Sequence, residues 1–283
     1  MIALGLAVAA HAGAWTRELG SAYVKAGWDG YTTTAYAAPS TVAPGAGAAQ
    51  SLGVQSYFGY QASLYGEAGL SPAHPVQLSA AVPLAVGTTQ FREENPLGAI
   101  EVYATVVRPG DLRVMPQLAL SRKLPLAVAV ETKVPLYRND AVCADNNYAL
   151  YCAHPGDGQI DVTGWAFAGA PLVHGRGFVE GGLGYRARTE WYLGFTTDAE
   201  LADGVVGAAT AGWNLGPVLA MWKADAVVDW KRDEVTPQGL RTGPALIATV
   251  FEGFALEARG SYDLWVRNTS RGVGFGGGVS WRR

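Results

Sequence analysis

The stretch Leu52–Leu70, LGVQSYFGYQASLYGEAGL, alternates between apolar side chains and polar or small ones along most of its length. Phe58 and Leu64 stand at even positions, whereas Gln61 and Glu67 stand at odd positions. Because successive side chains of a strand point to opposite faces of a sheet, this pattern predicts one strand with an apolar face and a polar face. The stretch is about three times as long as an ordinary globular strand. Such strands are typical of membrane-spanning β-barrels, which need roughly 9–11 residues per crossing.

The composition favours the same class of protein. Charged residues make up 16% of the chain, well under the roughly 25% usual for soluble domains. Glycine and aromatic residues are frequent, with 37 Gly, 9 Trp and 13 Tyr. The mean hydropathy is only +0.10, and the sequence holds no apolar run of about 18 residues that could form a transmembrane helix. A net charge of −3 gives no electrostatic basis for binding nucleic acid.

The alternation recurs along the chain and divides it into strands joined by connections of two lengths. Short connections are expected near Ser71–Pro75, Arg122–Pro125, Pro171–Gly177, Asn214–Pro217 and Glu252–Gly253. Longer ones are expected near Thr33–Gln50, Thr89–Pro109, Tyr137–Gly158, Glu190–Ala202 and Arg232–Gly239, with a modest one at Asn268–Arg271. Single-chain outer-membrane barrels alternate short periplasmic turns with longer outer loops. The sequence therefore predicts one domain over residues 13–283, an all-β transmembrane antiparallel up-and-down barrel of about 12 strands with periplasmic termini.

Two segments complicate this strand count. Ile100–Val106 alternates like another strand, and a barrel of about 14 strands is the alternative if it crosses the membrane. We interpret it as part of a folded outer loop, with Gly98–Arg108 able to turn inward and constrict the barrel. Pro116 falls inside a predicted strand, where we expect a bulge. A soluble periplasmic β-sandwich would show the same periodicity, but the strand length and the alternating connections favour the membrane.

The N-terminus predicts export. Ile2–Ala10 is apolar, and Ala10-His11-Ala12 matches a signal-peptidase site, so residues 1–12 are expected to be a signal peptide, although no basic residue precedes the apolar run. The remaining segment Gly13–Leu19 is too short for a large plug domain. In an oxidising periplasm, Cys143 and Cys152 are expected to form a local disulfide.

Several short motifs carry a resemblance to a known group of proteins. They are Ser63–Leu70 (SLYGEAGL), Ala81–Leu84 (AVPL), Gly110–Val114 (GDLRV) and Lys133–Pro135 (KVP) before a long loop. Together they resemble Gram-negative outer-membrane barrels, some of which are transporters linked to phenol meta-cleavage pathways. The resemblance implies a 12-stranded barrel that passes small, apolar molecules, without a catalytic motif. Many such barrels end on an aromatic residue, whereas here Arg282 and Arg283 follow Trp281.

The polar face of the predicted strands carries both signs of charge. Buried charges are costly unless they pair or contact water, so these residues form either a structural ion-pair network or a solvated pathway. Lys133, Glu131, Lys223, Asp225 and Arg259 are expected to line or block the lumen. The full set of expected lumen-lining residues is Lys25, Glu67, Arg113, Glu131, Lys133, Asp161, Glu180, Arg186, Lys223, Asp225, Asp229, Glu257, Arg259 and Asp263.

Other functions have weaker support in the sequence. An outer-membrane hydrolase would need a histidine beside a serine or an acid. His74 and His174 fall in predicted turns, which leaves His154 with Asp145 and Asp157. The loop acids would also suit calcium, but their spacing matches no EF-hand, and Gly274–Gly278 is better suited to coiling at the barrel closure than to phosphate.

We therefore expect a monomeric channel or transporter in the bacterial outer membrane. Its partners would be membrane lipid and a small-molecule solute, without enzymatic activity, cofactor, metal or nucleic acid. The alternative is an occluded structural or receptor-like barrel whose outer loops carry the function.

Overall fold

A computed structural model describes residues 14–36, 54–71, 75–95, 98–121, 124–137, 158–172, 176–192, 202–229, 236–267 and 269–283. The described strands are β1 (Ala22–Tyr36), β2 (Val54–Gly69), β3 (Val76–Asn95), β4 (Gly98–Pro109), β5 (Asp111–Ala119), β6 (Leu126–Pro135), β7 (Gln159–Leu172), β8 (Gly177–Tyr192), β9 (Gly204–Asn214), β10 (Val218–Asp229), β11 (Gln238–Phe251), β12 (Phe254–Arg267) and β13 (Ser270–Arg282). Within these residues, no helix is long and apolar enough to cross a membrane.

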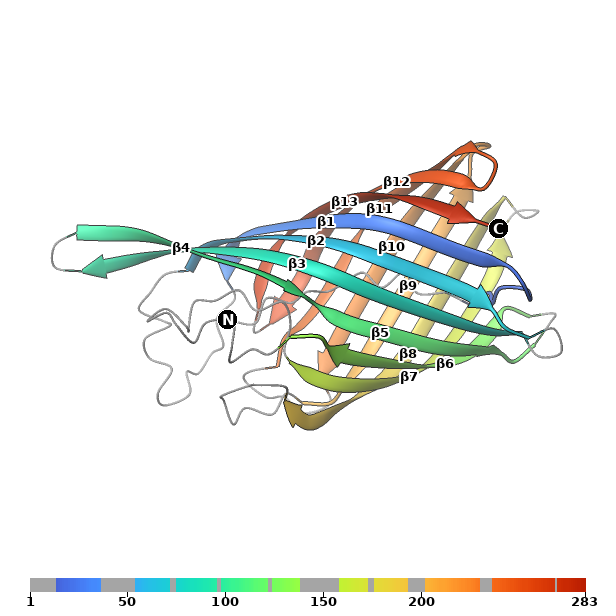
Figure 1. The fold of residues 1–283 in the computed structure, drawn as a ribbon, viewed down its shortest axis with the longest axis horizontal. Helices are drawn as coiled ribbons and strands as arrows, with labels where there is room; N and C mark the ends of the chain where they lie inside the picture. Colours follow the sequence, from blue (N-terminus) through green and yellow to red (C-terminus); the bar gives the residue numbers. More distant parts are fainter. Residues whose placement is uncertain are drawn as a thin grey trace.

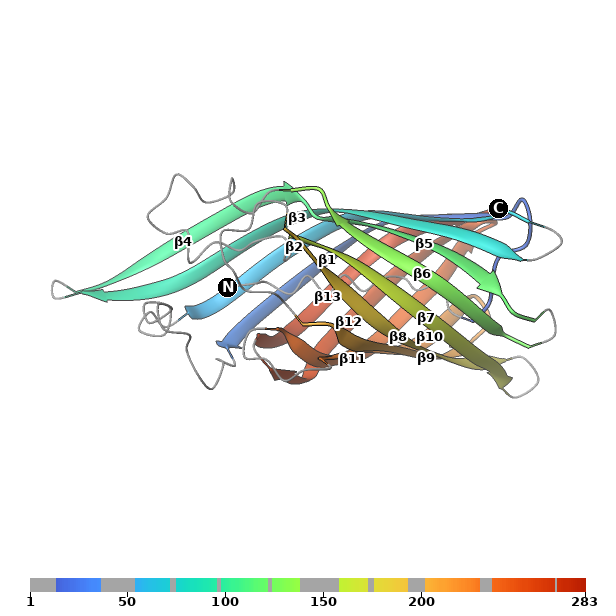
Figure 2. The same ribbon diagram turned by 90° about the horizontal axis from the view of Figure 1, so that it is seen from below.

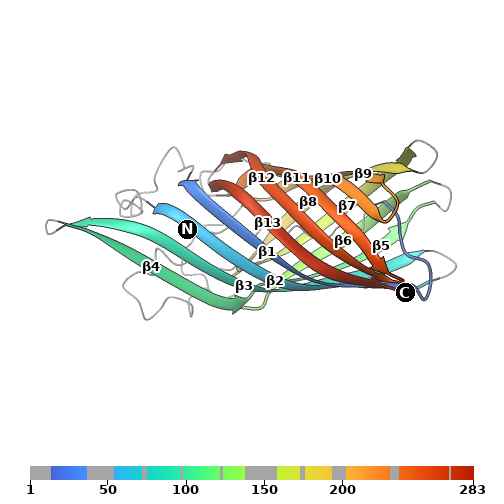
Figure 3. The same ribbon diagram turned by 90° about the horizontal axis from the view of Figure 1, so that it is seen from above.

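Twelve of these strands close into an antiparallel barrel, in which all but β4 take part (Figure 1). Neighbours along the chain pair with one another, and β13 returns to pair with β1, from Tyr23 opposite Arg282 to Tyr36 opposite Ser270. Figure 3 shows β12, β13, β1 and β2 side by side across this seam. The predicted up-and-down barrel of about 12 strands is therefore confirmed.

The segment around Ile100–Val106 adds no crossing to the barrel, as expected, but the inward turn predicted for it is wrong. It belongs to β4, which pairs with the outer half of β3, from Leu84 opposite Pro109 to Asn95 opposite Gly98. The inner half of β3 pairs with β5 instead. Figures 1 and 2 show the hairpin of β3 and β4 reaching beyond the rest of the barrel. Gly98–Arg108 is thus neither a separate crossing nor a loop turned into the mouth, because its alternating residues find a partner along the unusually long β3.

Gly110 marks the junction between β4 and β5. Its N–H donates to the carbonyl of Pro83 at 2.8 Å, and its own carbonyl accepts from the N–H of Leu136 at 3.3 Å. A Cβ at position 110 would meet Cγ of Pro83 at 2.8 Å, so the close approach to β3 requires glycine. Beyond this point β3 changes its partner from β5 to β4.

The bulge expected at Pro116 is absent from the described ladders. Pro116 stands opposite Leu78 of β3 without a register shift. On the other side, β5 pairs with β6 at Val114 and again at Gln117 in unchanged register. Proline removes one N–H donor without displacing the chain, so the ladder is interrupted at that point and the strand stays regular.

The two faces of the barrel differ in polarity. Large apolar side chains are exposed on its outer face, among them Leu64 at 57% and Leu183 at 65% of full exposure. The alternate positions face inward, and there the buried residues include many polar and charged ones. This is the reverse of a soluble protein and the arrangement expected of a membrane barrel.

Candidate functional site

The charged residues expected in the lumen all occupy strand positions that alternate with outward-facing apolar ones. Lys25, Glu131, Lys133, Asp161, Asp229, Glu257 and Asp263 are buried, whereas Glu67, Arg113, Glu180, Arg186, Lys223, Asp225 and Arg259 are partly buried. The structure brings many of them together in pairs along two parts of the wall.

The first group of ion pairs reaches across β13, from β1 to β12. The ammonium of Lys25 lies 2.5 Å from Oε2 of Glu257. Arg259 binds Asp29 through two nitrogens, and its Nη1 lies 3.1 Å from Oε1 of Glu257. Gly276 of β13 lies between these strands, opposite both Asp29 and Arg259. A Cβ there would meet Oδ1 of Asp29 at 2.5 Å, so this glycine makes room for the ion pairs as well as for any coiling of the closing strand.

Farther along the same wall, Asp263 binds Arg241 and Tyr31. Nε of Arg241 lies 2.7 Å from Oδ1 of Asp263, and Nη2 lies 3.3 Å from Oδ2. The hydroxyl of Tyr31 donates to Oδ2 of the same carboxylate at 2.6 Å. The guanidinium also lies over the Tyr31 ring, 4.6 Å from its centroid. This bidentate pair is rigid compared with a lysine contact.

The opposite wall carries a second group of pairs. Nη1 of Arg113 lies 2.9 Å from Oε1 of Glu131, and Nζ of Lys133 lies 2.8 Å from Oδ2 of Asp161. Elsewhere, Gln238 donates an amide hydrogen to Oδ2 of Asp229 at 2.5 Å. Many of the interior charges are therefore compensated within the wall, as their burial requires.

An apolar cluster also lies inside the barrel, which sequence reasoning missed. Trp165 and Phe167 of β7 are buried and stacked, with ring centroids 5.3 Å apart. Met115, Ala127, Ala129, Val206 and Val227 belong to the same cluster. Its sequence signal is the continuation of one alternation, since Asp161 and Thr163 precede Trp165 and Phe167 on the same face of the strand.

The segment before β1 crosses the interior near the short connections, and we call residues Ala14–Ser21 the strap. At one end, the N–H of Ala14 donates to Oε2 of Glu180 on β8 at 3.3 Å, and Ala14 packs in the apolar cluster. At the other end, the N–H of Arg17 donates to Oε1 of Gln77 on β3 at 2.9 Å, while its side chain pairs with Glu67 of β2. The strap therefore spans the interior from β8 to β2 and β3.

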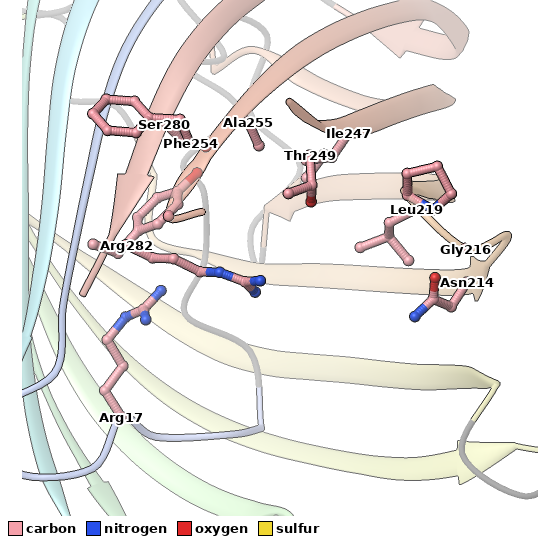
Figure 4. A pocket seen from close by; sticks show the side chains of 13 residues that line it. Arg17, Asn214, Gly216, Leu219, Ile247, Thr249, Phe254, Ala255, Ser280 and Arg282 are labelled. Atoms are coloured by element: carbon pink, nitrogen blue, oxygen red, sulfur yellow. The ribbon is translucent and has the colours of Figure 1, made fainter. Parts of the chain in front are cut away.

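Beside the strap lies a pocket of about 360 Å³, shown in Figure 4. The ends of β9–β13 and the start of β1 form its wall, and Arg17 of the strap completes it. In Figure 4 the side chains of Arg17 and Arg282 both point toward the space between these strands. The full lining is Arg17, Tyr23, Asn214, Gly216, Pro217, Leu219, Ile247, Thr249, Gly253, Phe254, Ala255, Ser280 and Arg282.

Comparisons with known proteins bear on this fold. No protein-family model matches the chain, and no curated protein matches it in sequence. Among solved structures, it is similar to the COG4313 outer membrane channel from Pseudomonas putida F1, with a TM-score of 0.68 and 12% identity over 94% of this chain and 97% of that one. The chain has the fold of an outer-membrane β-barrel. The translocator domain of the autotransporter NalP from Neisseria meningitidis is more distant, with a TM-score of 0.46 and 13% identity over 94% of this chain and 90% of that one.

Other expected features of this outer-membrane barrel fold lie outside the described residues. They are the signal peptide over 1–12, the cysteines Cys143 and Cys152, the histidines His74, His154 and His174, and the loop acids Asp145 and Asp157. Within the described ranges, no group of three or more His, Cys, Asp or Glu side chains could hold a metal ion.

Proposed function

We propose that this protein is an outer-membrane channel through which small molecules diffuse passively. The observation that supports the proposal most directly is the division of the closed barrel into an apolar outer face and a charged inner face. Leu64 and Leu183 represent the outer face, while Lys25, Glu257 and Arg259 represent the inner one. A lipid bilayer would cover the exposed apolar side chains, and a polar interior suits water and solutes.

The outer-membrane location belongs to the same proposal. A signal peptide over residues 1–12 would direct export, and an oxidising periplasm would allow the disulfide between Cys143 and Cys152. Because β1 and β13 of one chain close the barrel, a monomer is sufficient for the channel. The resemblance to barrels linked to phenol meta-cleavage pathways makes small, apolar molecules the first solutes to test.

The strap and the ion pairs favour a second candidate function. The strap occupies part of the lumen, and the pairs around Glu257 fill space beside β13. A barrel of about 12 strands lies between the small ones that side chains fill and the large ones that keep a channel. An occluded barrel would act as a receptor or scaffold, and the projecting hairpin of β3 and β4 would then be its most accessible surface.

Single-channel conductance in a planar lipid bilayer distinguishes the two functions. We expect steady, ohmic current steps from the folded barrel. Permeation of neutral solutes into vesicles that contain the protein should rise in parallel. Correctly folded protein that gives no current and no solute flux would contradict the channel and favour the occluded barrel.

A further inference from the structure

The pocket beside the strap lies in the part of the barrel mouth that the strap leaves uncovered. The strap binds Glu180 on β8 at one end and Gln77 on β3 at the other. The pocket is formed instead by the ends of β9–β13, with Tyr23 of β1. A solute that travels along the interior toward the short connections would therefore have access to this pocket beside the strap.

Two guanidinium groups border this pocket, and among the described residues only one of them is paired with an acid. Arg17 directs its Nε to Glu67 and lies over the ring of Tyr23, 4.9 Å from its centroid. Arg282 is exposed, and in the described part of the chain its guanidinium has neither a hydrogen bond nor an ion pair. None of the residues that line the pocket is acidic. Arg282 is thus a cation whose hydrogen-bond donors are open to an anion.

The rest of the lining is mainly apolar with a few neutral polar groups. Leu219 and Ile247 contribute apolar side chains, while Asn214 and Thr249 contribute side chains that can form hydrogen bonds. A volume of about 360 Å³ is at the small end of the range for small-molecule sites, which is roughly 300–1,000 Å³. An inorganic anion would leave the apolar wall unused, whereas a neutral apolar molecule would leave the guanidinium unused.

We propose that this pocket binds a small carboxylate that carries an apolar body. Arg282 would receive the carboxylate, and Leu219 and Ile247 would contact the body. The assignment of this ligand as a transported solute rests on the proposed channel function, but binding itself does not.

Equilibrium binding of benzoate to the folded, detergent-solubilised barrel tests the site. We expect saturable binding of one benzoate, and at least about tenfold weaker binding of benzyl alcohol, which has a similar body without the charge. Arg282→Gln should weaken benzoate binding about tenfold, because it removes a charge-assisted hydrogen bond. Arg283→Gln is the matched control, since Arg283 is adjacent and exposed but does not line the pocket; its binding should equal that of the unmodified protein.

Three results would overturn the proposal: no saturable benzoate binding, equal binding of benzyl alcohol, or unchanged binding by Arg282→Gln. Heat-modifiable gel mobility shows whether each variant is folded. Conductance separates this inference from the proposed channel. Benzoate binding without current would reject the channel and keep the site, whereas current without benzoate binding would reject the site and keep the channel.

Discussion

The ammonium of Lys25 on β1 lies 2.5 Å from the carboxylate of Glu257 on β12, although β13 runs between these two strands. Contact across a whole strand is possible because β13 places Gly276 and Gly278 at the interior positions between them. A large side chain at either position would occupy the space that the ion pairs now fill. The closing strand and the interior charges therefore depend on one another.

Replacement of Gly276 by alanine should destabilise the barrel by about 1–3 kcal/mol, the usual cost of overpacking. The added Cβ would meet both Oδ1 of Asp29 and the backbone oxygen of Trp28 at 2.5 Å, and the backbone atom cannot move cheaply. Urea unfolding in lipid vesicles, followed by tryptophan fluorescence, measures the change. Gly181→Ala is the control, since the nearest atom to its added Cβ would be the Ala208 oxygen at 3.7 Å. Equal stability of the two variants would contradict the argument.

Lys133→Met should cost about 3–5 kcal/mol, because it leaves a buried carboxylate without its cation. Lys133 and Asp161 are 5% and 2% exposed, and their charged atoms lie 2.8 Å apart. The double variant Lys133→Met/Asp161→Asn should recover most of the loss, since the carboxylate that Lys133 neutralises is then absent as well. A double-mutant cycle on the unfolding free energies measures the coupling. Additive losses would show that the two residues do not interact.

Leu183→Arg should lower stability in a bilayer by about 2–4 kcal/mol if the apolar outer face contacts lipid near its midplane. Leu183 lies within β8 and is 65% exposed. Leu215→Arg is the matched substitution, because Leu215 is 59% exposed but lies in the turn between β9 and β10. It should have little effect. Similar small losses for both variants would argue against a membrane around this face.

Deletion of residues 14–19 should raise single-channel conductance, because the strap would no longer cross the mouth. The barrel itself should still close, since β1 begins only at Ala22. Leu19→Ala is the control within the strap, because Leu19 is 54% exposed. An unchanged conductance in the deletion variant would show that the strap does not limit the current.

Replacement of Thr88–Thr105 by a two-residue Asn-Gly turn should leave a folded barrel. Gly87 and Val106 stand opposite each other, so a tight turn can join them. The inner half of β3 would keep its pairing with β5. Heat-modifiable gel mobility tests this outcome, and a variant that cannot fold would show that β4 is part of the barrel wall.

The sequence was sufficient to predict most of the barrel but not the arrangement of its interior. Alternation depends only on which face a residue occupies, so it located strands such as β2 and β12 without knowledge of their neighbours. It could not show that Ile100–Val106 would pair along β3, because pairing depends on a distant strand. It also could not show whether the side chains of Trp165 and Phe167 face lipid or pack inside the barrel. The strap depends on contacts to Glu180 and Gln77, which are far from it in sequence.

The seam between β1 and β13 sets the order in which the protein can assemble. β1 is the first described strand of the chain and β13 is the last, so the wall cannot be sealed until every strand between them is available. Pairing between strands that are far apart in sequence is slow, and until β13 pairs with β1 the exposed edge of β1 could pair with the wrong strand. With glycine at Gly274, Gly276 and Gly278, β13 brings little bulk to the interior when it docks. The ion pairs of Lys25 and Asp29 with β12 can therefore form as the seam closes, in the space that these glycines leave.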